Sequence, residues 1–155
     1  MSYCTIDGIK NLFPEEKIIQ LTDDENNAPS TIDPADPDCA AIIARINDAI
    51  DYADQLIDGY LRGRYTLPLS TAPSFLEKLS IDLVIFYLYG RKPELSDEKM
   101  DKMYNNAVKL LERIQAGTIS LGTSDTKEAI AATGEYATNK TADDRVFSKT
   151  VLDGF

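Results

Sequence analysis

Residues 75–89, with the sequence FLEKLSIDLVIFYLY, form the most apolar stretch of the chain. The apolar side chains recur at helical spacing and cover more than one face, which is typical of a helix at the centre of a domain. The next residues predict where this helix ends, because Gly90 suits a left-handed cap and Pro93 cannot continue a helix. We therefore expect a central helix over 75–89.

Two amphipathic segments flank this helix in the sequence. Apolar residues recur every three or four positions over 42–60 and again over 100–114, with charged residues between them. We expect Asp38 to cap the first of these helices and Gly117 to end the second. Gly59 lies inside the first helix, where glycine costs about 1 kcal/mol relative to alanine.

Two shorter helices are expected at the start of the chain, over 6–12 and 14–21. Thr5 can cap the first, and Pro14 belongs in the first turn of the second. No segment alternates apolar and polar residues with comparable strength, so we expect no strand. The sequence thus predicts an all-α fold, a compact helical bundle of about four to five helices.

One polar segment interrupts the predicted helices. Residues 22–38 are rich in aspartate and asparagine and contain three prolines, which exclude a helix through them. A loop of this length in a compact domain is usually functional or mobile. We expect a helical core domain over 1–117 that includes this acidic loop.

A second polar segment follows the core. Residues 118–155 are expected to form an extended C-terminal arm, because apolar residues become sparse there until the last part of the sequence. They return in a docking segment over 145–155, and apolar anchors at the end of a polar arm are typical of a segment that docks on a partner. The residues expected to make this interaction are Arg145, Val146, Phe147, Leu152 and Phe155.

The composition restricts the chemistry that this chain can perform. Its 155 residues include no histidine, and 26 acidic residues outnumber 16 basic ones to give a net charge of −10. The lack of histidine removes the commonest general base and the commonest transition-metal ligand. A surface poor in lysine and arginine binds phosphate backbones weakly. We expect no enzymatic activity, no cofactor and no direct sequence-specific binding of nucleic acid.

The sequence also restricts the compartment. No apolar run is long enough to span a bilayer, and the first residues lack the basic and apolar regions of a signal peptide. We therefore expect no membrane partner. Cys4 and Cys39 are expected to be free thiols in a reducing cytoplasm.

The acidic loop contains a partial calcium-binding pattern. Asp23, Glu25 and Asn27 have the alternation of oxygen ligands that calcium loops use. Ala28 and Pro34, however, stand where such a loop needs a glycine and a closing glutamate. We therefore favour a solvated loop over a metal site.

Asp82 lies in the apolar helix with isoleucine before it and leucine after it. A buried carboxylate is usually paired or hydrogen-bonded, so we expect an ion pair with Arg62, Arg64 or Arg91. The alternative from another class of protein is an acid–base role for Asp82 in a hydrolase without histidine.

Four basic residues follow the ends of predicted helices. Arg62, Arg64, Arg91 and Lys92 could form a small basic site. Their positions instead favour capping of helix C-termini and pairing with nearby acids. The glycines around Arg62 do not form a phosphate-binding loop, because no strand precedes them.

Several segments of the chain form a recognisable series. They are SYCT at 2–5, IQLTD at 19–23, IDGYLRGRYTLPL at 57–69, the stretch from Asp82 to LYG at 88–90, and RVFSK at 145–149 with GF at 154–155. In this order they resemble a family of small Mu-like prophage proteins encoded among head and tail morphogenesis genes. We expect structural roles for the residues Gly59, Tyr60, Arg62, Arg64, Tyr65, Pro68, Asp82 and Gly90.

The resemblance implies a virion structural protein that acts by protein–protein assembly, as a head-completion or head–tail connector (neck) subunit. The implied partners are other virion proteins on the portal or tail-completion side, together with further copies of the chain in a ring. The implied location is the bacterial cytoplasm during assembly and then the virion. The alternative is a small non-enzymatic regulatory module that binds a ligand or an ion through the acidic loop or the basic residues.

Overall fold

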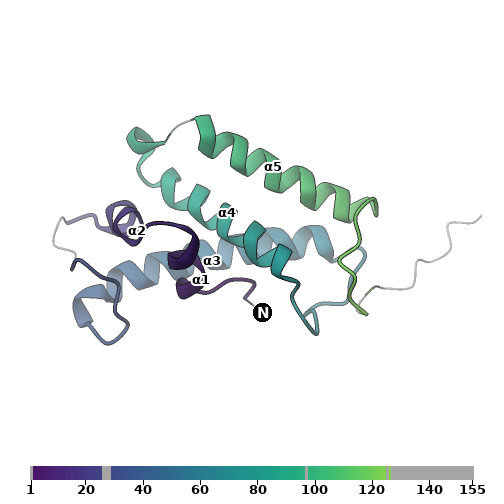
Figure 1. Ribbon diagram of the computed structural model, residues 1–155, viewed down its shortest axis with the longest axis horizontal. Coiled ribbons are helices and arrows are strands. Elements are labelled where there is room, and N and C mark those ends of the chain that lie inside the picture. The colour runs from purple at the N-terminus through teal and green to yellow at the C-terminus, as the bar shows by residue number, and fades with distance from the viewer. Residues whose placement is uncertain (1, 26–28, 97, 125, 127–155) are drawn as a thin grey trace, which may run out of the picture.

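The structure is a computed structural model that describes residues 2–25, 29–96, 98–124 and 126. The described part contains five α-helices, two short 3-10 helices and, in place of a sheet, one isolated bridge between Tyr65 and Thr126. The elements are α1 (Ile6–Leu12), α2 (Glu15–Thr22), η1 (Pro37–Cys39), α3 (Ala40–Leu61), α4 (Ser74–Gly90), η2 (Pro93–Leu95) and α5 (Glu98–Gln115). The predicted all-α fold is confirmed (Figure 1).

Helix α4 is the central element of the bundle. It contacts α1, α2, α3 and α5, and in Figure 1 it runs between α3 and α5. Its fully buried side chains point in several directions and include Leu76, Leu83, Val84 and Leu88. The expected central helix is therefore confirmed, with one more residue at each end than the apolar pattern predicted.

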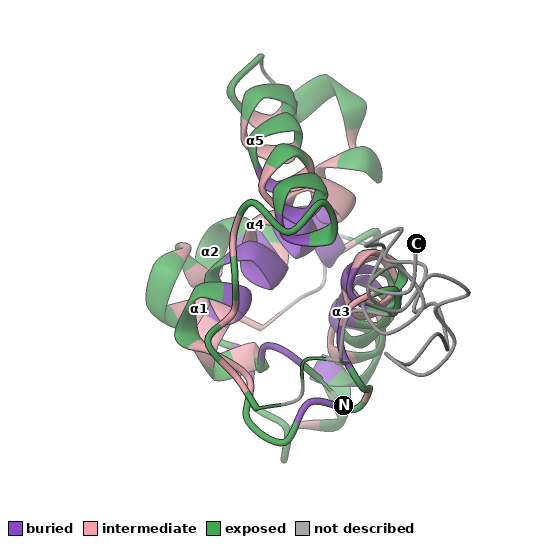
Figure 2. Cartoon of the chain, turned by 90° about the vertical axis from the view of Figure 1, so that its right-hand side faces the viewer, coloured by how far each residue is buried: buried purple, intermediate pink, exposed green. Residues whose placement is uncertain are grey.

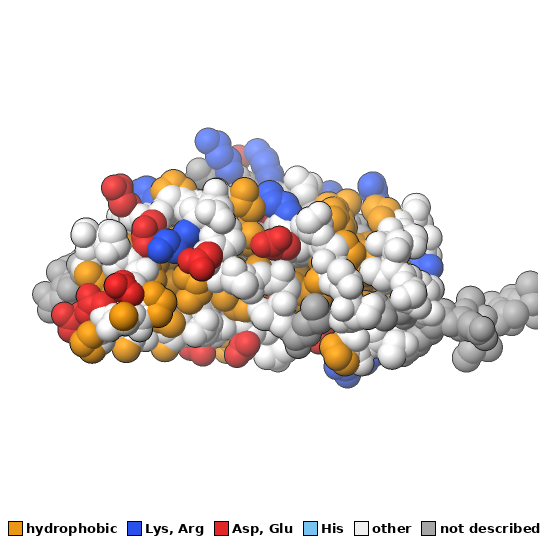
Figure 3. All heavy atoms as spheres, turned by 60° about the horizontal axis from the view of Figure 1, so that its bottom comes forward, with side chains coloured by type: hydrophobic (Ala, Val, Ile, Leu, Met, Phe, Trp, Pro, Cys, Tyr) orange, Lys and Arg blue, Asp and Glu red, His pale blue; other side chains and the backbone are white. Residues whose placement is uncertain are grey.

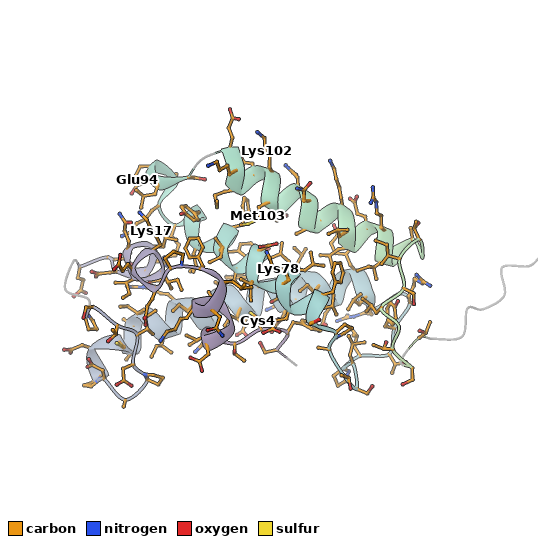
Figure 4. All side chains as sticks on the ribbon, viewed as in Figure 1. Cys4, Lys17, Lys78, Glu94, Lys102 and Met103 are labelled. Atoms are coloured by element: carbon orange, nitrogen blue, oxygen red, sulfur yellow. The ribbon has the colours of Figure 1, made fainter. Side chains whose placement is uncertain are left out.

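Helices α3 and α5 each bury one side against α4 and against each other. Figure 2 shows the buried residues of α3 and α5 on the sides that face the interior. Met103 of α5 points toward α4, whereas Lys102 points outward (Figure 4). The ring of Tyr104 stacks on that of Phe86 in α4, with centroids 4.1 Å apart. The amphipathic patterns thus predicted correctly which faces pack.

The start of α3 differs from the prediction. Asp38 does not cap the helix; its backbone amide instead donates a hydrogen bond to the side chain of Asp36, 3.0 Å away. Asp36 thereby caps η1, and the last residue of η1, Cys39, leads directly into α3. The 3-10 turn therefore places the capping residue two positions earlier than expected.

The end of α4 also differs from the prediction. Gly90 is the last residue of the helix, and Arg91 follows with a φ of −74°, so no left-handed cap is formed. Pro93 opens η2 and prevents the helix from continuing.

The predicted cap of α1 is confirmed, because the hydroxyl of Thr5 accepts a hydrogen bond from the amide of Gly8 at 3.1 Å.

The described start of the arm, residues 118–124 and 126, lies on the helical core. Ile119 and Leu121 pack against core side chains, and the amide of Leu121 donates a hydrogen bond to the hydroxyl of Tyr65 at 3.0 Å. Figure 1 shows this stretch passing from the end of α5 to the end of α3. The expected docking residues, Arg145, Val146, Phe147, Leu152 and Phe155, lie outside the described residues.

Candidate assembly surface

The segment from Gly59 to Tyr65 ends α3 and joins three parts of the molecule. Asp58, just before it, accepts a hydrogen bond from the hydroxyl of Tyr3 in the N-terminal segment. Arg64 donates a hydrogen bond to the carbonyl of Ile114 near the end of α5, at 2.8 Å. Tyr65 is fully buried and binds the arm through its hydroxyl. This segment therefore connects α3 to the N-terminal segment, to α5 and to the start of the arm.

Arg64 caps the C-terminal end of α5. Carbonyl groups at this end of a helix carry partial negative charge, which a guanidinium stabilises. Gly117 makes room for the arginine: its φ is +85°, and a Cβ built on it would lie 2.9 Å from Nη1 of Arg64. Arg64 therefore caps a helix C-terminus as predicted, but that of α5 and not that of the helix that it follows. Pro68 lies in the loop that follows, after a cis peptide bond.

Asp82 pairs with a different residue from those predicted. Its carboxylate forms an ion pair with Lys78, one turn earlier on α4, and its side chain is 19% exposed. Of the predicted partners, Arg64 binds the end of α5 and Arg91 pairs with Asp24. The expected ion pair with an arginine is therefore wrong. The actual pair has the local i,i+4 spacing that helices favour.

Ion pairs hold the acidic loop to the core. Asp24 binds Arg45 of α3 at 2.9 Å and Arg91 at 2.7 Å. The hydrogen bond from Arg91, together with the nearby positive charges, lowers the pKa of Asp24. Lys92 donates hydrogen bonds to two carbonyls at the end of α2. The predicted pairing and capping by Arg91 and Lys92 are confirmed.

The partial calcium pattern is not assembled into a site in the described part of the loop. Asp23 accepts a hydrogen bond from the amide of Glu25 at 3.1 Å, which forms a local turn, and Asn27 lies outside the described residues. No group of three or more potential metal ligands occurs among the residues that the structure describes. Acidic side chains nevertheless gather at the end of the molecule that carries this loop (Figure 3).

Buried polar groups anchor the N-terminal segment. The amide of Tyr3 donates a hydrogen bond to Asp54 at 3.1 Å, and burial raises the pKa of Asp54. Burial also raises the pKa of the Cys4 thiol to about 11, although Ser80 donates a hydrogen bond to its sulfur. A thiol that is so rarely ionised is a poor nucleophile. Cys4 and Cys39 are both free, as predicted.

Two open hollows lie along α3 and share the lining residue Gln55. One, of about 300 Å³, lies beside Gly59, and the other, of about 190 Å³, lies nearer the middle of the helix. We call the two hollows together the α3 groove; its lining residues are Asp48, Asp51, Tyr52, Gln55, Leu56, Gly59, Tyr60 and Gln115. Sequence reasoning missed this surface. The signal was Tyr52, a large aromatic residue in the polar stripe of the predicted helix, which is 61% exposed.

Comparison with known proteins identifies the family. Residues 3–140 match the family described as Bacteriophage Mu, Gp36. The chain belongs to this family. The resemblance inferred from the sequence segments is therefore confirmed, and the chain is a protein of Mu-like phages.

Two relatives illustrate the extent of the match to other Gp36 family members. The Mu-like prophage FluMu protein gp36 of Haemophilus influenzae is 37% identical over 87 residues, which cover 56% of this chain and 60% of that protein. Gene product J of Escherichia phage Mu is 28% identical over 149 residues, which cover 96% of each chain. Among the described residues of this Gp36 family member, no helix has the length and apolarity needed to cross a membrane.

Proposed function

We propose that this chain is a virion structural protein, a head-completion or head–tail connector (neck) subunit that acts by protein–protein assembly and not as an enzyme. Membership of the Mu Gp36 family supports a role in phage structure and morphogenesis. The proposed partners are other virion proteins on the portal or tail-completion side, with further copies of this chain in a ring. The proposed location is the cytoplasm during assembly and the virion afterwards.

The observation that supports the connector role is that charged residues which could have formed a chemical site instead make structural contacts. Asp24, Asp82, Arg64 and Arg91 hold the loop, the central helix and the helix ends in place. The exposed helix faces and the arm are then the surfaces left for partners. A rigid helical block that carries an arm suits a connector, because an arm can order when it meets its neighbour.

The charge of the chain also suits this role. Its net charge is −10, and a negative surface repels DNA instead of adhering to it. A subunit beside the path of packaged DNA benefits from this repulsion, since the DNA must pass without sticking.

Deletion of residues 141–155 from the phage that encodes this chain tests the proposal. We expect heads and tails to accumulate unjoined, as seen by electron microscopy after induction. We expect the melting temperature of the purified core to stay within about 2 °C of the full chain, because the helical core is built from other residues.

Replacement of Phe147, Leu152 and Phe155 by serine is the matched control, because it keeps the length of the arm and removes only its apolar anchors. It should reproduce the assembly defect of the deletion. Normal joining of heads to tails in both variants would contradict the proposed role of the arm, and a large fall in melting temperature would show that the arm stabilises its own core.

A further inference from the structure

Among the residues that the structure describes, none packs against Gly59 closely enough to require a glycine there. It lies in the last turn of α3, and helical hydrogen bonds continue past it to Tyr65. Glycine lowers the stability of a helix relative to alanine. A Cβ built on Gly59 would nevertheless meet no atom of the described part of the chain within 4 Å. The position beside Gly59 therefore has room for a side chain from a partner.

The space beside Gly59 belongs to the α3 groove. The larger hollow, about 300 Å³, is lined on one side by α3 and on the other by Gln115 at the end of α5. Leu56 and Tyr60 provide apolar surface there, and Tyr52 continues it into the second hollow, where its ring lies 5.8 Å from that of Tyr87. Because Gly59 has no side chain and its neighbours Leu56 and Tyr60 are apolar, the hollow can accommodate large apolar side chains from a partner.

Charge distinguishes the two ends of the α3 groove. Asp48 and Asp51 line the second hollow, and both are exposed. A ligand that combines apolar anchors with positive charge would therefore complement it. The segment 145–155 combines Phe147, Leu152 and Phe155 with two basic residues against one acidic residue, in a chain that is otherwise strongly acidic.

The path of the chain brings this segment within reach. Thr126, the last described residue, is bridged to Tyr65, just beyond the Gly59 end of the groove. The 19 residues from there to Arg145 span up to about 60 Å when extended. This length is sufficient to reach the groove of a neighbouring copy.

We propose that the α3 groove of one copy receives the segment 145–155 of the next copy, with Gly59 as the position of closest approach. The inference rests on the proposed assembly function and names the surface that the arm binds. A contact between an arm and a different surface is heterologous, and repeated contacts of this kind form a ring when the rotation from one copy to the next closes. The apolar anchors enter beside Gly59, and Arg145 and Lys149 face Asp48 and Asp51.

Photo-crosslinking of the full-length chain tests this placement. Benzoylphenylalanine is introduced at Phe147, and copies labelled with ¹⁵N are mixed with unlabelled copies. Mass spectrometry then separates crosslinks within one chain from those between chains. We expect crosslinks between copies at Gln55, Leu56, Tyr60 or Gln115.

The substitution Gly59→Gln provides the second arm of the experiment. Glutamine favours a helix and extends into the hollow, so we expect crosslinking between copies to fall by about tenfold or more while the melting temperature stays the same or rises. Gly90→Gln is the matched control, since Gly90 is also helical and exposed, has no described atom within 4 Å of a Cβ built on it, and does not line the groove. It should leave the crosslinks unchanged.

The outcomes separate the groove from the assembly function. Crosslinks between copies at another surface, unaffected by Gly59→Gln, would overturn the groove and leave the arm-mediated assembly intact. Crosslinks confined to a single chain would overturn docking between copies. Equal losses in the Gly59→Gln and Gly90→Gln variants would show that the space beside Gly59 plays no part.

Discussion

The guanidinium of Arg64 occupies the space that a side chain at residue 117 would fill. The arginine uses this position to bind the carbonyl of Ile114, which leaves the end of α5 capped by a residue from the end of α3. A glycine at 117 is needed both for its positive φ and for this contact. Gly122 has a positive φ as well, but no described atom lies within 4 Å of a Cβ built on it.

Gly117→Ala should therefore destabilise the chain more than Gly122→Ala. Both substitutions incur the cost of a left-handed conformation, about 1–2 kcal/mol. At Gly117 the new methyl also displaces Arg64 from its carbonyl, which adds about 1.5–3 kcal/mol for a hydrogen bond from a charged group. The free energy of unfolding in urea measures the difference.

The double substitution isolates the contact. When Arg64 is first replaced by alanine, Gly117→Ala should cost no more than Gly122→Ala, because the displaced hydrogen bond is already absent. Equal costs of the two glycine substitutions in the unmodified chain would show that Arg64 shifts without loss.

Also at the scale of single residues, some capping and pairing predictions made from the sequence were correct and others were wrong. The hydroxyl of Thr5 caps α1 as predicted. The partner of Asp82 was mispredicted, because an almost entirely apolar helix does not indicate which side meets solvent. Its actual partner, Lys78, was visible at i−4. Gly90 was mispredicted because glycine permits a left-handed cap without requiring one.

Among the elements, the N-terminal segment depends on two carboxylates of α3. Asp54 accepts a hydrogen bond from the amide of Tyr3, and Asp58 accepts one from its hydroxyl. Desolvation raises the pKa of Asp54. The folded chain therefore binds a proton at Asp54 more tightly than the unfolded chain, so this residue lowers stability as the pH rises through its folded pKa.

Asp54→Asn should accordingly raise the melting temperature at pH 7 by about 1–5 °C, because asparagine keeps the acceptor for Tyr3 and carries no charge. The gain should shrink as the pH is lowered through the raised pKa of Asp54, because the carboxyl group of the unmodified chain then takes up its proton and loses its charge. Asp51→Asn, at an exposed position of the same helix, is the control. A gain that is independent of pH would contradict the role of desolvation.

Element by element, apolar periodicity predicted α3, α4 and α5 and the faces by which α3 and α5 pack, and capping signals predicted α1 and α2. Neither signal predicted contacts between distant segments. Tyr65 is fully buried because the start of the arm packs over it, with the amide of Leu121 bound to its hydroxyl. No local sequence pattern predicts this contact between distant residues. The α3 groove was missed for the same reason, since Gln115 and Gly59 line one hollow from two different helices.

At the scale of the whole molecule, the acidic residues differ in whether they pair with basic residues or remain exposed to solvent. Asp24 and Asp82 form ion pairs within the molecule, whereas Asp48 and Asp51 lie exposed in the α3 groove. Exposed charges at the edge of an interface mainly affect the rate of encounter and its dependence on salt. The proposed docking of segment 145–155 should therefore weaken as ionic strength rises.

Replacing both Asp48 and Asp51 by lysine should weaken association between copies roughly tenfold at low salt, and less at high salt where such charges are screened. Sedimentation velocity over a series of salt concentrations measures the effect. Replacing Arg145 and Lys149 by glutamate in the same chain should restore association, because the attraction is rebuilt with opposite signs. The control is the pair Glu16→Lys and Glu94→Lys, which changes the net charge equally outside the groove. If this control weakens association as much, net charge and not the α3 groove governs assembly.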